Sequence, residues 1–164
     1  KSCQNCLKVN EASQINPAIS NDRLIRIGER IDLSRFGKYS RVYLGGGWSV
    51  PENWGVWSLD KKASLTLPLP ASAPKKLVID TQAFIGGAQS SQDVEIWING
   101  APQARVTLNK RFGNEIEVPL PAAVLNSEKL KVDFVFPTAV SPKALGIGID
   151  DRPLAIGLEA VRYE

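Results

Sequence analysis

Alternating apolar and polar positions run through most of this chain and predict β-strands. In Ala63-Ser-Leu-Thr-Leu-Pro-Leu69 every second residue is apolar, so these side chains share one face of a half-buried strand. The same period of two marks residues 94–98, 116–120 and 130–136. Asn99-Gly100 follows the first of these segments and predicts a tight hairpin, because both central residues of that turn need a positive φ.

Apolar runs and turn residues complete the expected set of strands. Further strands are expected at residues 76–84, 103–108 and 154–163. Pro68 has no N–H to donate, so it places the first strand, or its end, at a sheet edge. Helix is expected only as single turns, at residues 32–36 and at 121–126, where Pro121 suits the start of a helix.

Many short strands separated by turn residues are typical of a sandwich. The 164 residues include 11 prolines and 13 glycines. We therefore expect an all-β fold, a jelly-roll-like β-sandwich of two antiparallel sheets with little helix. Residues 1–22 are polar without a clear period and are expected to form a linker or lead-in. A single sandwich domain is expected to follow over residues 23–164.

The amino-acid composition excludes most of the common catalytic mechanisms. The chain has no His, which excludes Ser-His-Asp and Cys-His nucleophile pairs, His general bases and His metal ligands. Two cysteines without His do not favour a structural zinc site. We expect no catalytic residue, no cofactor and no metal site in this chain.

Other features bear on the setting and on the partners. The chain contains no Met, so we expect it to be a processed or excised piece of a longer product. It has no run of about 18 apolar residues, so no membrane span is expected within it. Lys and Arg are scattered and the net charge is only +3, so no nucleic-acid partner is expected.

Cys3 and Cys6 form a CxxC in the polar N-terminal stretch. A redox motif of this kind normally lies between a strand and a helix of a βαβ unit, and the sequence predicts no such unit. We favour a local Cys3–Cys6 disulfide in an oxidising compartment, or two thiols whose partners lie upstream.

Three of the four tryptophans, Trp48, Trp54 and Trp57, lie within ten positions. Indole rings are large and costly to expose, so a cluster needs a reason. One reason is a hydrophobic corner of the sandwich, which the usual burial of Trp favours. Another is a platform on which an apolar sugar face stacks while nearby polar groups bind its hydroxyls.

The same segment resembles a family signature. Pro51-Glu-Asn-Trp-Gly-Val-Trp-Ser58 is similar to a Pro-Glu-x-Trp-Gly-x-Trp-Ser sequence near the C-terminus of bacterial phosphoglycerol transferases, which decorate osmoregulated periplasmic glucans. Similar C-terminal domains follow the membrane spans of some envelope glycosyltransferases. Arg152-Pro-Leu-Ala-Ile-Gly-Leu158 resembles the family's closing Arg-x-Leu-Gly-Ile-Gly pattern. The resemblance covers residues 28–163, and its specific motifs lie at the two ends.

This resemblance implies a periplasmic location, attached to an inner-membrane parent protein, and an accessory role. In that family the transfer chemistry belongs to an upstream, sulfatase-like, metal-dependent domain that needs His ligands. The resemblance therefore implies no catalytic residue in this chain. The N-terminal CxxC is not part of the family pattern.

Charged residues in the two motifs leave two interpretations open. A Glu52–Arg152 ion pair would fasten a loop to the sandwich, because the planar guanidinium can hold a carboxylate bidentately. Alternatively, Glu52, Asp150 and Arg152 line a sugar site beside the Trp rings. Asp150-Asp151 is a weak signal for Ca²⁺, and no second acid is placed convincingly for glycoside hydrolysis.

Trp97 is out of phase with Val94, Ile96 and Ile98. It is therefore predicted to lie on the opposite sheet face from Ile96. There it would be covered by a loop or packed on another domain of the parent, since an exposed apolar patch often marks an interface.

These inferences lead to one preferred function and two alternatives. We expect a non-catalytic, carbohydrate-binding accessory domain of a membrane-anchored periplasmic transferase, with a glycan or glucan as ligand. The candidate contacts are Trp48, Trp54, Trp57, Glu52, Arg152 and Asp150. The first alternative is a structural domain that docks on the parent catalytic domain, and the second is an independent glycosidase that depends on Glu52.

Overall fold

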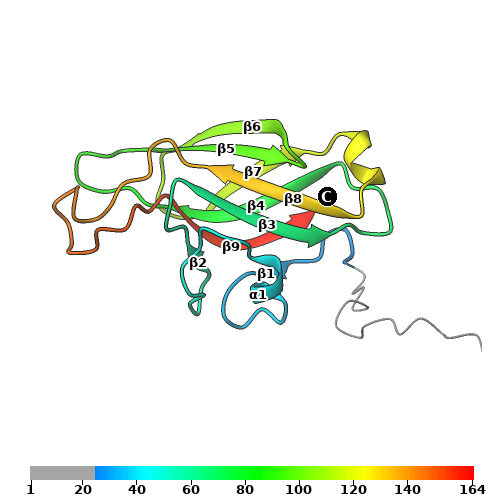
Figure 1. The fold of residues 1–164 in the computed structure, drawn as a ribbon, viewed down its shortest axis with the longest axis horizontal. Coiled ribbons are helices and arrows are strands. Elements are labelled where there is room, and N and C mark those ends of the chain that lie inside the picture. The colour runs from blue at the N-terminus through cyan, green and yellow to red at the C-terminus, as the bar shows by residue number, and fades with distance from the viewer. Residues whose placement is uncertain (1–24) are drawn as a thin grey trace, which may run out of the picture.

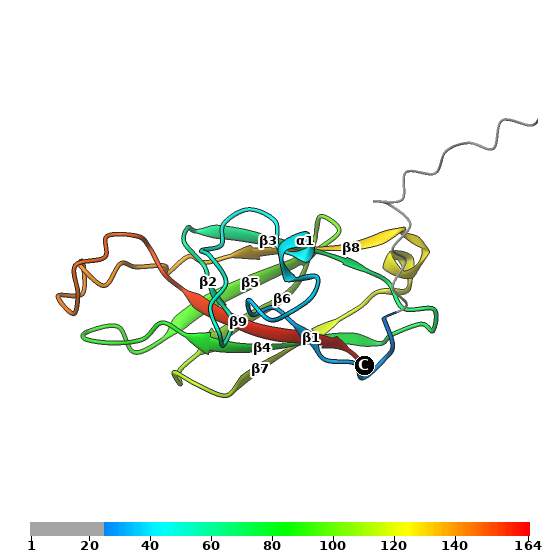
Figure 2. The ribbon, with the colours of Figure 1, turned by 90° about the horizontal axis from the view of Figure 1, so that it is seen from below.

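Two antiparallel β-sheets pack face to face in the computed structural model, which describes residues 25–164 (Figure 1). Sheet A has the order β1 (Ile31–Asp32), β9 (Ile156–Tyr163), β4 (Lys76–Ala83) and β7 (Asn114–Pro119), and β2 (Val56–Trp57) also pairs with β9. Sheet B has the order β3 (Lys62–Pro68), β8 (Lys129–Val135), β5 (Gln92–Ile98) and β6 (Ala101–Leu108). Figure 2 shows β3 and β8 in one layer and β9 and β4 in the other. The all-β, two-sheet sandwich expected from the sequence is confirmed.

Helix is limited to two short pieces in the described residues, α1 (Ser40–Tyr43) and the 3₁₀ turn η1 (Ala122–Asn126). Neither has the length and apolar composition needed to cross a membrane. Pro121 lies at the N-cap of η1, so the turn expected there is confirmed. The lead-in expected at residues 1–22, with Cys3 and Cys6, lies outside the described residues.

The core follows the predicted alternation. Ala63, Leu65 and Leu67 of β3 are buried, whereas the residues between them are half-buried on the other face. The same pattern holds in β8, β5 and β7. Burying one such Leu or Val side chain stabilises the fold by about 1.5–3 kcal/mol. β3 is an edge strand of sheet B and ends at Pro68, as its missing N–H predicts.

The Asn99-Gly100 hairpin between β5 and β6 is also confirmed. Asn99 has φ 46° and Gly100 has φ 85°, the left-handed pair that this turn requires. The Asn99 side chain also reaches the neighbouring strand. Its Oδ1 accepts a hydrogen bond from the Lys131 N–H at 2.7 Å, which ties the turn to β8.

The helical turn expected at residues 32–36 is wrong. Ile31 and Asp32 instead form the short strand β1, paired with Val161 and Ala160 of β9. Ile31 is buried, and the Asp32 carboxylate accepts a hydrogen bond from the Ser34 N–H at 2.8 Å. A hydrogen bond that an Asp carboxylate accepts from the backbone N–H two residues later favours a turn over a helix.

The segment between α1 and β2 closes one side of the sandwich. The Gly45 N–H donates to the Ser64 carbonyl at 2.8 Å, and the Ser64 N–H donates to the Gly46 carbonyl at 3.0 Å. Residues 45–46 therefore cover the free edge of β3 at Ser64, while β1 and β2 pair with the edge of β9. Such cover reduces the number of unpaired N–H and C=O groups that an edge strand offers to other chains.

Ser58 links this segment to the start of β9. Its buried Oγ accepts hydrogen bonds from the N–H groups of Ala155 at 3.1 Å and Ile156 at 3.0 Å. Its own N–H donates to the Ile156 carbonyl at 2.9 Å. A buried donor left without a partner costs about 1–3 kcal/mol, so this hydroxyl is central to the closure.

We expect Ser58→Ala to lower the free energy of unfolding by about 2–4 kcal/mol, because two buried N–H groups lose their acceptor. Chemical denaturation followed by circular dichroism measures the change. Ser127→Ala, at an exposed position, is the matched control and should leave stability unchanged. Equal midpoints for the two variants would show that the hydroxyl is dispensable.

Candidate functional site

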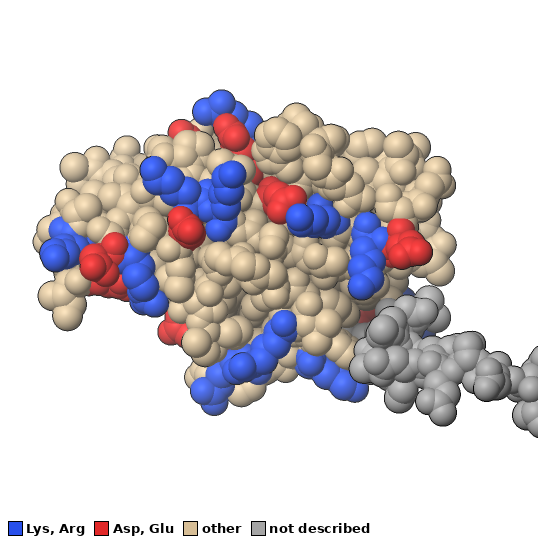
Figure 3. Space-filling view, in the orientation of Figure 1, with Lys and Arg blue, Asp and Glu red and all other residues tan. Residues whose placement is uncertain are grey.

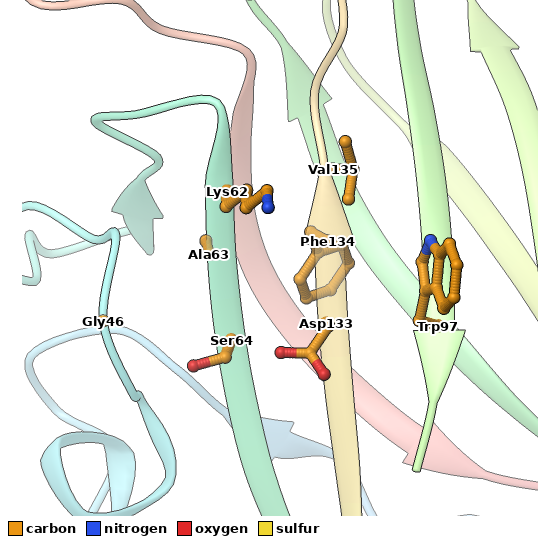
Figure 4. A pocket seen from close by; sticks show the side chains of 8 residues that line it. All are labelled: Gly46, Lys62, Ala63, Ser64, Trp97, Asp133, Phe134 and Val135. Carbon is orange, nitrogen blue, oxygen red and sulfur yellow. The ribbon is translucent and has the colours of Figure 1, made fainter. Parts of the chain in front are cut away.

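An open hollow lies on the outer face of sheet B, over β3, β8 and β5 (Figure 4). Its volume is about 470 Å³. The residues that line it are Gly46, Lys62, Ala63, Ser64, Trp97, Asp133, Phe134 and Val135. Figure 4 shows the three strands side by side in front of β9, with the Trp97 ring standing on β5.

The strand register places polar side chains in rows across this face. Ser64 lies opposite Asp133 on the β3–β8 pair, and Asp133 lies opposite Trp97 on the β8–β5 pair. Because opposite residues share a face of the sheet, these three side chains form one row. The next row contains Lys62, Val135, Glu95 and Arg105.

A second hollow lies on the other side of Trp97, towards β6. Its volume is about 380 Å³. Its lining residues are Glu95, Trp97, Pro102, Gln103, Ala104 and Arg105. The pairing shifts here: Ile96 lies opposite Ala104, but Trp97 lies opposite Pro102, which leaves Gln103 as an extra residue. Such a bulge re-aims side chains, and the indole becomes a wall shared by both hollows.

Trp97 occupies the face that the sequence predicts. Ile96 is fully buried in the core, whereas Trp97 is only half-buried. The two side chains alternate along β5, so the prediction that they face opposite sides of the sheet is confirmed. The ring is thus a large apolar surface on an outer face otherwise rich in charge.

The charges beside the indole are loosely paired. The Asp133 Oδ1 lies 3.8 Å from the Lys131 Nζ, and the Glu95 Oε1 lies 3.5 Å from the Arg105 Nη1. Exposed pairs of this kind are screened and weak, so their carboxylates can accept, and the Arg105 guanidinium can donate, hydrogen bonds to a ligand. Lys62 makes no ion pair with any other described residue. Donors and acceptors around one apolar ring suit a polyhydroxylated ligand.

Gly46 forms part of the rim of the first hollow. A Cβ built there meets nothing within 4 Å, so the position is open and a side chain would project into free space. Its neighbours differ, since a Cβ at Gly45 would lie 2.3 Å from the Ser64 Oγ and one at Gly47 would lie 2.1 Å from the Lys62 carbonyl oxygen. The close approach to β3 therefore requires Gly47, where a Cβ would meet backbone atoms, whereas a side chain at Gly45 would first displace the Ser64 hydroxyl and one at Gly46 would meet nothing.

The structure splits the tryptophan cluster into two parts. The Trp48 ring packs edge-on against the buried Phe134 at 5.7 Å between centroids, and its Nε1 donates to the Ser64 carbonyl at 2.8 Å. Trp48 thus braces the closed side of the sandwich. None of Trp48, Trp54 and Trp57 lines either hollow.

Trp54 and Trp57 lie together at the β9 edge. Their rings contact edge-on at 5.2 Å, and Trp57 contacts Phe84 in the same way at 6.3 Å. Trp54 lies over Gly157, where a Cβ would come within 2.7 Å of the six-membered ring. Gly157 is therefore needed for this packing, and both indoles keep a half-exposed surface.

The Glu52–Arg152 ion pair is not present. Arg152 instead holds Asp150. Its Nε donates to Oδ1 at 2.9 Å and to Oδ2 at 3.2 Å, and its Nη2 donates to Oδ2 at 2.7 Å. The Arg152 backbone N–H also donates to Oδ1 at 3.0 Å. A partner two residues away closes this ring at little cost in chain entropy, which explains why it wins over the distant Glu52. The charge of Glu52 raises the pKa of Arg152 by electrostatic attraction alone, and this is the smallest of the effects that shift that pKa.

The Asp150 carboxyl is perturbed by this contact. Hydrogen bonds from the Arg152 side chain, and then from its backbone N–H, lower the pKa of Asp150 to about 2. Conversely, the hydrogen bond to Asp150 raises the pKa of Arg152. The pair therefore stays charged at any pH near neutrality, and Arg152 is already engaged rather than free to bind a ligand.

Comparisons with known proteins are limited to the fold. No protein-family model matches the chain, and no curated protein matches it. Among solved structures, an acetyl xylan esterase from the rumen bacterium Butyrivibrio proteoclasticus matches 83% of this chain at 13% identity, with a TM-score of 0.51. The chain spans 32% of the length of that esterase.

Two further structures are carbohydrate-binding modules with lower scores. The CBM36-1 domain of a multidomain xylanase, from the hindgut metagenome of Trinervitermes trinervoides, matches 74% of this chain and 89% of its own at 13% identity, with a TM-score of 0.46. A CBM36 module in complex with calcium and xylotriose matches 83% of this chain and 99% of its own at 8% identity, also with a TM-score of 0.46. Because the sequence identities are so low, the match to the esterase establishes only that the two proteins share a sandwich fold.

We expect Arg152→Gln to raise the titration midpoint of Asp150 from about 2 towards its ordinary value of 3.8, because the carboxylate loses its main hydrogen-bond donor. Carboxyl chemical shifts followed by NMR against pH measure it. In the unmodified protein the pair breaks only as the pH falls through the lowered pKa. Arg162→Gln, which removes a guanidinium bound to other carboxylates, should not move the midpoint. The same midpoint in all three proteins would refute the assigned partner.

Proposed function

We propose that this chain is a non-catalytic glycan-binding module whose site is the outer face of sheet B around Trp97. One observation carries the proposal: a half-buried indole stands on a charged sheet face, between two hollows whose linings combine apolar surface with polar and charged side chains. The C–H face of a sugar ring stacks on such an indole, and its hydroxyls bind to polar groups at the ring's edge.

The arrangement suits an oligosaccharide better than a single sugar. The hollows lie on opposite sides of Trp97 along the β3-β8-β5-β6 direction. A chain stacked on the indole would therefore run across the strands and extend into both hollows. Asp133 and Ser64 would meet it on one side of the ring, and Arg105 and Gln103 on the other.

The sandwich shared with the acetyl xylan esterase is compatible with this proposal. We further propose, from the two end motifs, that the module belongs to a membrane-anchored periplasmic transferase of the phosphoglycerol transferase type. Binding a glucan there would raise its effective concentration near a catalytic domain, because the second encounter becomes intramolecular.

A second candidate function is docking on the parent catalytic domain. The observation that favours it is the half-exposed aromatic group formed by Trp54, Trp57 and Phe84 on sheet A. Aromatic side chains of this kind are enriched in protein interfaces. The two functions use different sheets and are compatible with each other.

We expect Trp97→Ala to weaken binding of short β-linked glucose or xylose oligomers at least tenfold, which corresponds to about 1.4 kcal/mol. Isothermal titration calorimetry measures it, with folding checked by circular dichroism. Gly46→Leu should also weaken binding, because Gly46 lines the first hollow and has open space for a side chain, so a leucine would crowd the rim without a clash within the protein.

Trp54→Phe is the matched control, because it alters an indole on the other sheet, and it should bind like the unmodified chain. Loss of binding in Trp54→Phe with retention in Trp97→Ala would move the site to the β9 edge. If no oligomer binds the unmodified chain up to millimolar concentration, the proposal fails and docking becomes the preferred function.

A further inference from the structure

A stretch without acidic residues runs along the closed side of the sandwich. Residues 33–51 contain three cations, Arg35, Lys38 and Arg41, and no Asp or Glu. The stretch includes α1 and the loop that precedes β2. Figures 1 and 2 agree that these two parts project on the same side of the molecule, beyond β9. We call the surface formed by Arg35, Phe36, Lys38, Arg41 and Val42 the α1 edge.

Apolar side chains protrude from the same stretch. The exposed fraction is 65% for Phe36, 75% for Val42 and 70% for Val50. Phe36 and Val42 belong to the α1 edge, where two exposed apolar side chains beside three cations need an explanation, although isolated ones do not. The Arg35 guanidinium lies 4.9 Å from the centre of the Phe36 ring, and the Lys38 ammonium lies 5.4 Å from that of Tyr39. Charge and apolar surface are thus interleaved.

The three cations differ from those on sheet A. Arg162 and Lys76 each contact carboxylates at 3.5 Å or less. By contrast, Arg35, Lys38 and Arg41 form no ion pair with another residue of the described chain. In Figure 3 the lowest charged groups of the molecule, on the side where α1 lies in Figure 1, are Lys and Arg side chains, and an acidic group is visible beside them at the lower left. Asp32 and Glu52 flank the stretch, and the Arg35 N–H donates to the Glu52 carbonyl at 2.9 Å. Neither carboxylate forms an ion pair with the three cations, so positive charge is in excess on the α1 edge.

The backbone of the α1 edge is held in place by hydrogen bonds. The Gly37 N–H donates to the Ser34 carbonyl at 3.0 Å, and the Ser40 Oγ donates to the Gly37 carbonyl at 3.0 Å. The Phe36 N–H donates to the Ser34 Oγ at 3.2 Å. The protruding side chains are thus presented by an ordered turn, which lowers the entropy cost of binding a partner.

We propose that the α1 edge docks on the surface of an anionic lipid bilayer. Cations near such a surface gain electrostatic energy, and apolar side chains beside them enter the interface between headgroups and acyl chains. The apolar side chains here protrude, and neither of the two hollows on sheet B is lined by them. Protruding apolar tips ringed by cations suit a fluid bilayer better than a protein partner, which would need a matching cavity.

Such docking leaves the glycan site open. Trp97 lies on β5, the third strand of sheet B counted from β3, whereas the α1 edge lies beyond the covered edges of β3 and β9. A bilayer on the α1 edge would meet the side of the sandwich and not the outer face of sheet B. The two surfaces can therefore be occupied together.

Flotation of the 164-residue chain with lipid vesicles tests the proposal. Vesicles of equal parts phosphatidylcholine and phosphatidylglycerol are expected to carry the protein at low salt, and vesicles of phosphatidylcholine alone are not. The triple variant R35Q/K38Q/R41Q should lower partitioning on the order of a hundredfold. F36S/V42S keeps all charges and should lose binding selectively at raised salt, where screening leaves mainly the apolar contribution.

The matched control is K110Q/K129Q/K143Q, which removes the same charge from exposed positions elsewhere and should bind like the unmodified chain. Equal loss in both triple variants would refute the proposal, because net charge alone would then explain binding. Absence of binding to the anionic vesicles would also refute it. If polyglutamate is bound instead, and R35Q/K38Q/R41Q abolishes that binding, the surface serves an acidic polypeptide and the bilayer assignment is wrong.

Discussion

The closure of one side of the sandwich is the constraint on which the other features depend. Two edge strands, β3 and β9, would otherwise expose rows of unpaired backbone groups on this side. Residues 45–46 pair with β3, and β1 and β2 pair with β9. The Ser58 hydroxyl holds the end of this segment to the start of β9. The main structural role of the Gly- and Trp-rich segment, residues 45–58, is thus to join the two sheets.

This closure determines where each aromatic ring can act. Trp48 crosses from the closing segment to Phe134 and donates its N–H to β3, so its polar atom is already satisfied within the fold. Trp54 and Trp57 lie outside β9, over a glycine that leaves room for an indole. Of the closing segment only Gly46, which has no side chain, lines the first hollow, so this segment leaves Trp97 uncovered on sheet B.

Much of the fold could be predicted because its signals are local. Alternation along β3, β5 and β8, and the Asn99-Gly100 turn, depend only on neighbours in the sequence. The two-residue strands β1 and β2 could not be found this way, because they exist only through pairing with β9, more than 95 residues later in the chain. A segment of two residues has no period to detect.

The candidate site was predicted less well, also for a physical reason. Trp97 was placed on the correct face, but nothing in the sequence brings Ser64 and Asp133 beside it, since the register between β3, β8 and β5 is a tertiary property. The Trp-rich motif drew attention by composition, whereas the lone Trp among charged outer positions of β5 was the more informative signal. Proximity in sequence likewise decided the partner of Arg152, which took Asp150 rather than Glu52.

The distribution of charge gives the two proposed surfaces different kinds of partner. On the outer face of sheet B, cations and carboxylates alternate around an indole, so the face has many hydrogen-bonding groups and little net field. Such a surface favours a neutral, hydroxyl-rich ligand, whose binding should depend weakly on salt. On the α1 edge the three cations form no ion pair with the flanking Asp32 and Glu52 carboxylates, so positive charge is in excess there and the surface favours an anionic partner. Because the closing segment separates these surfaces, one sandwich can hold a glycan on its face while its side rests on a bilayer.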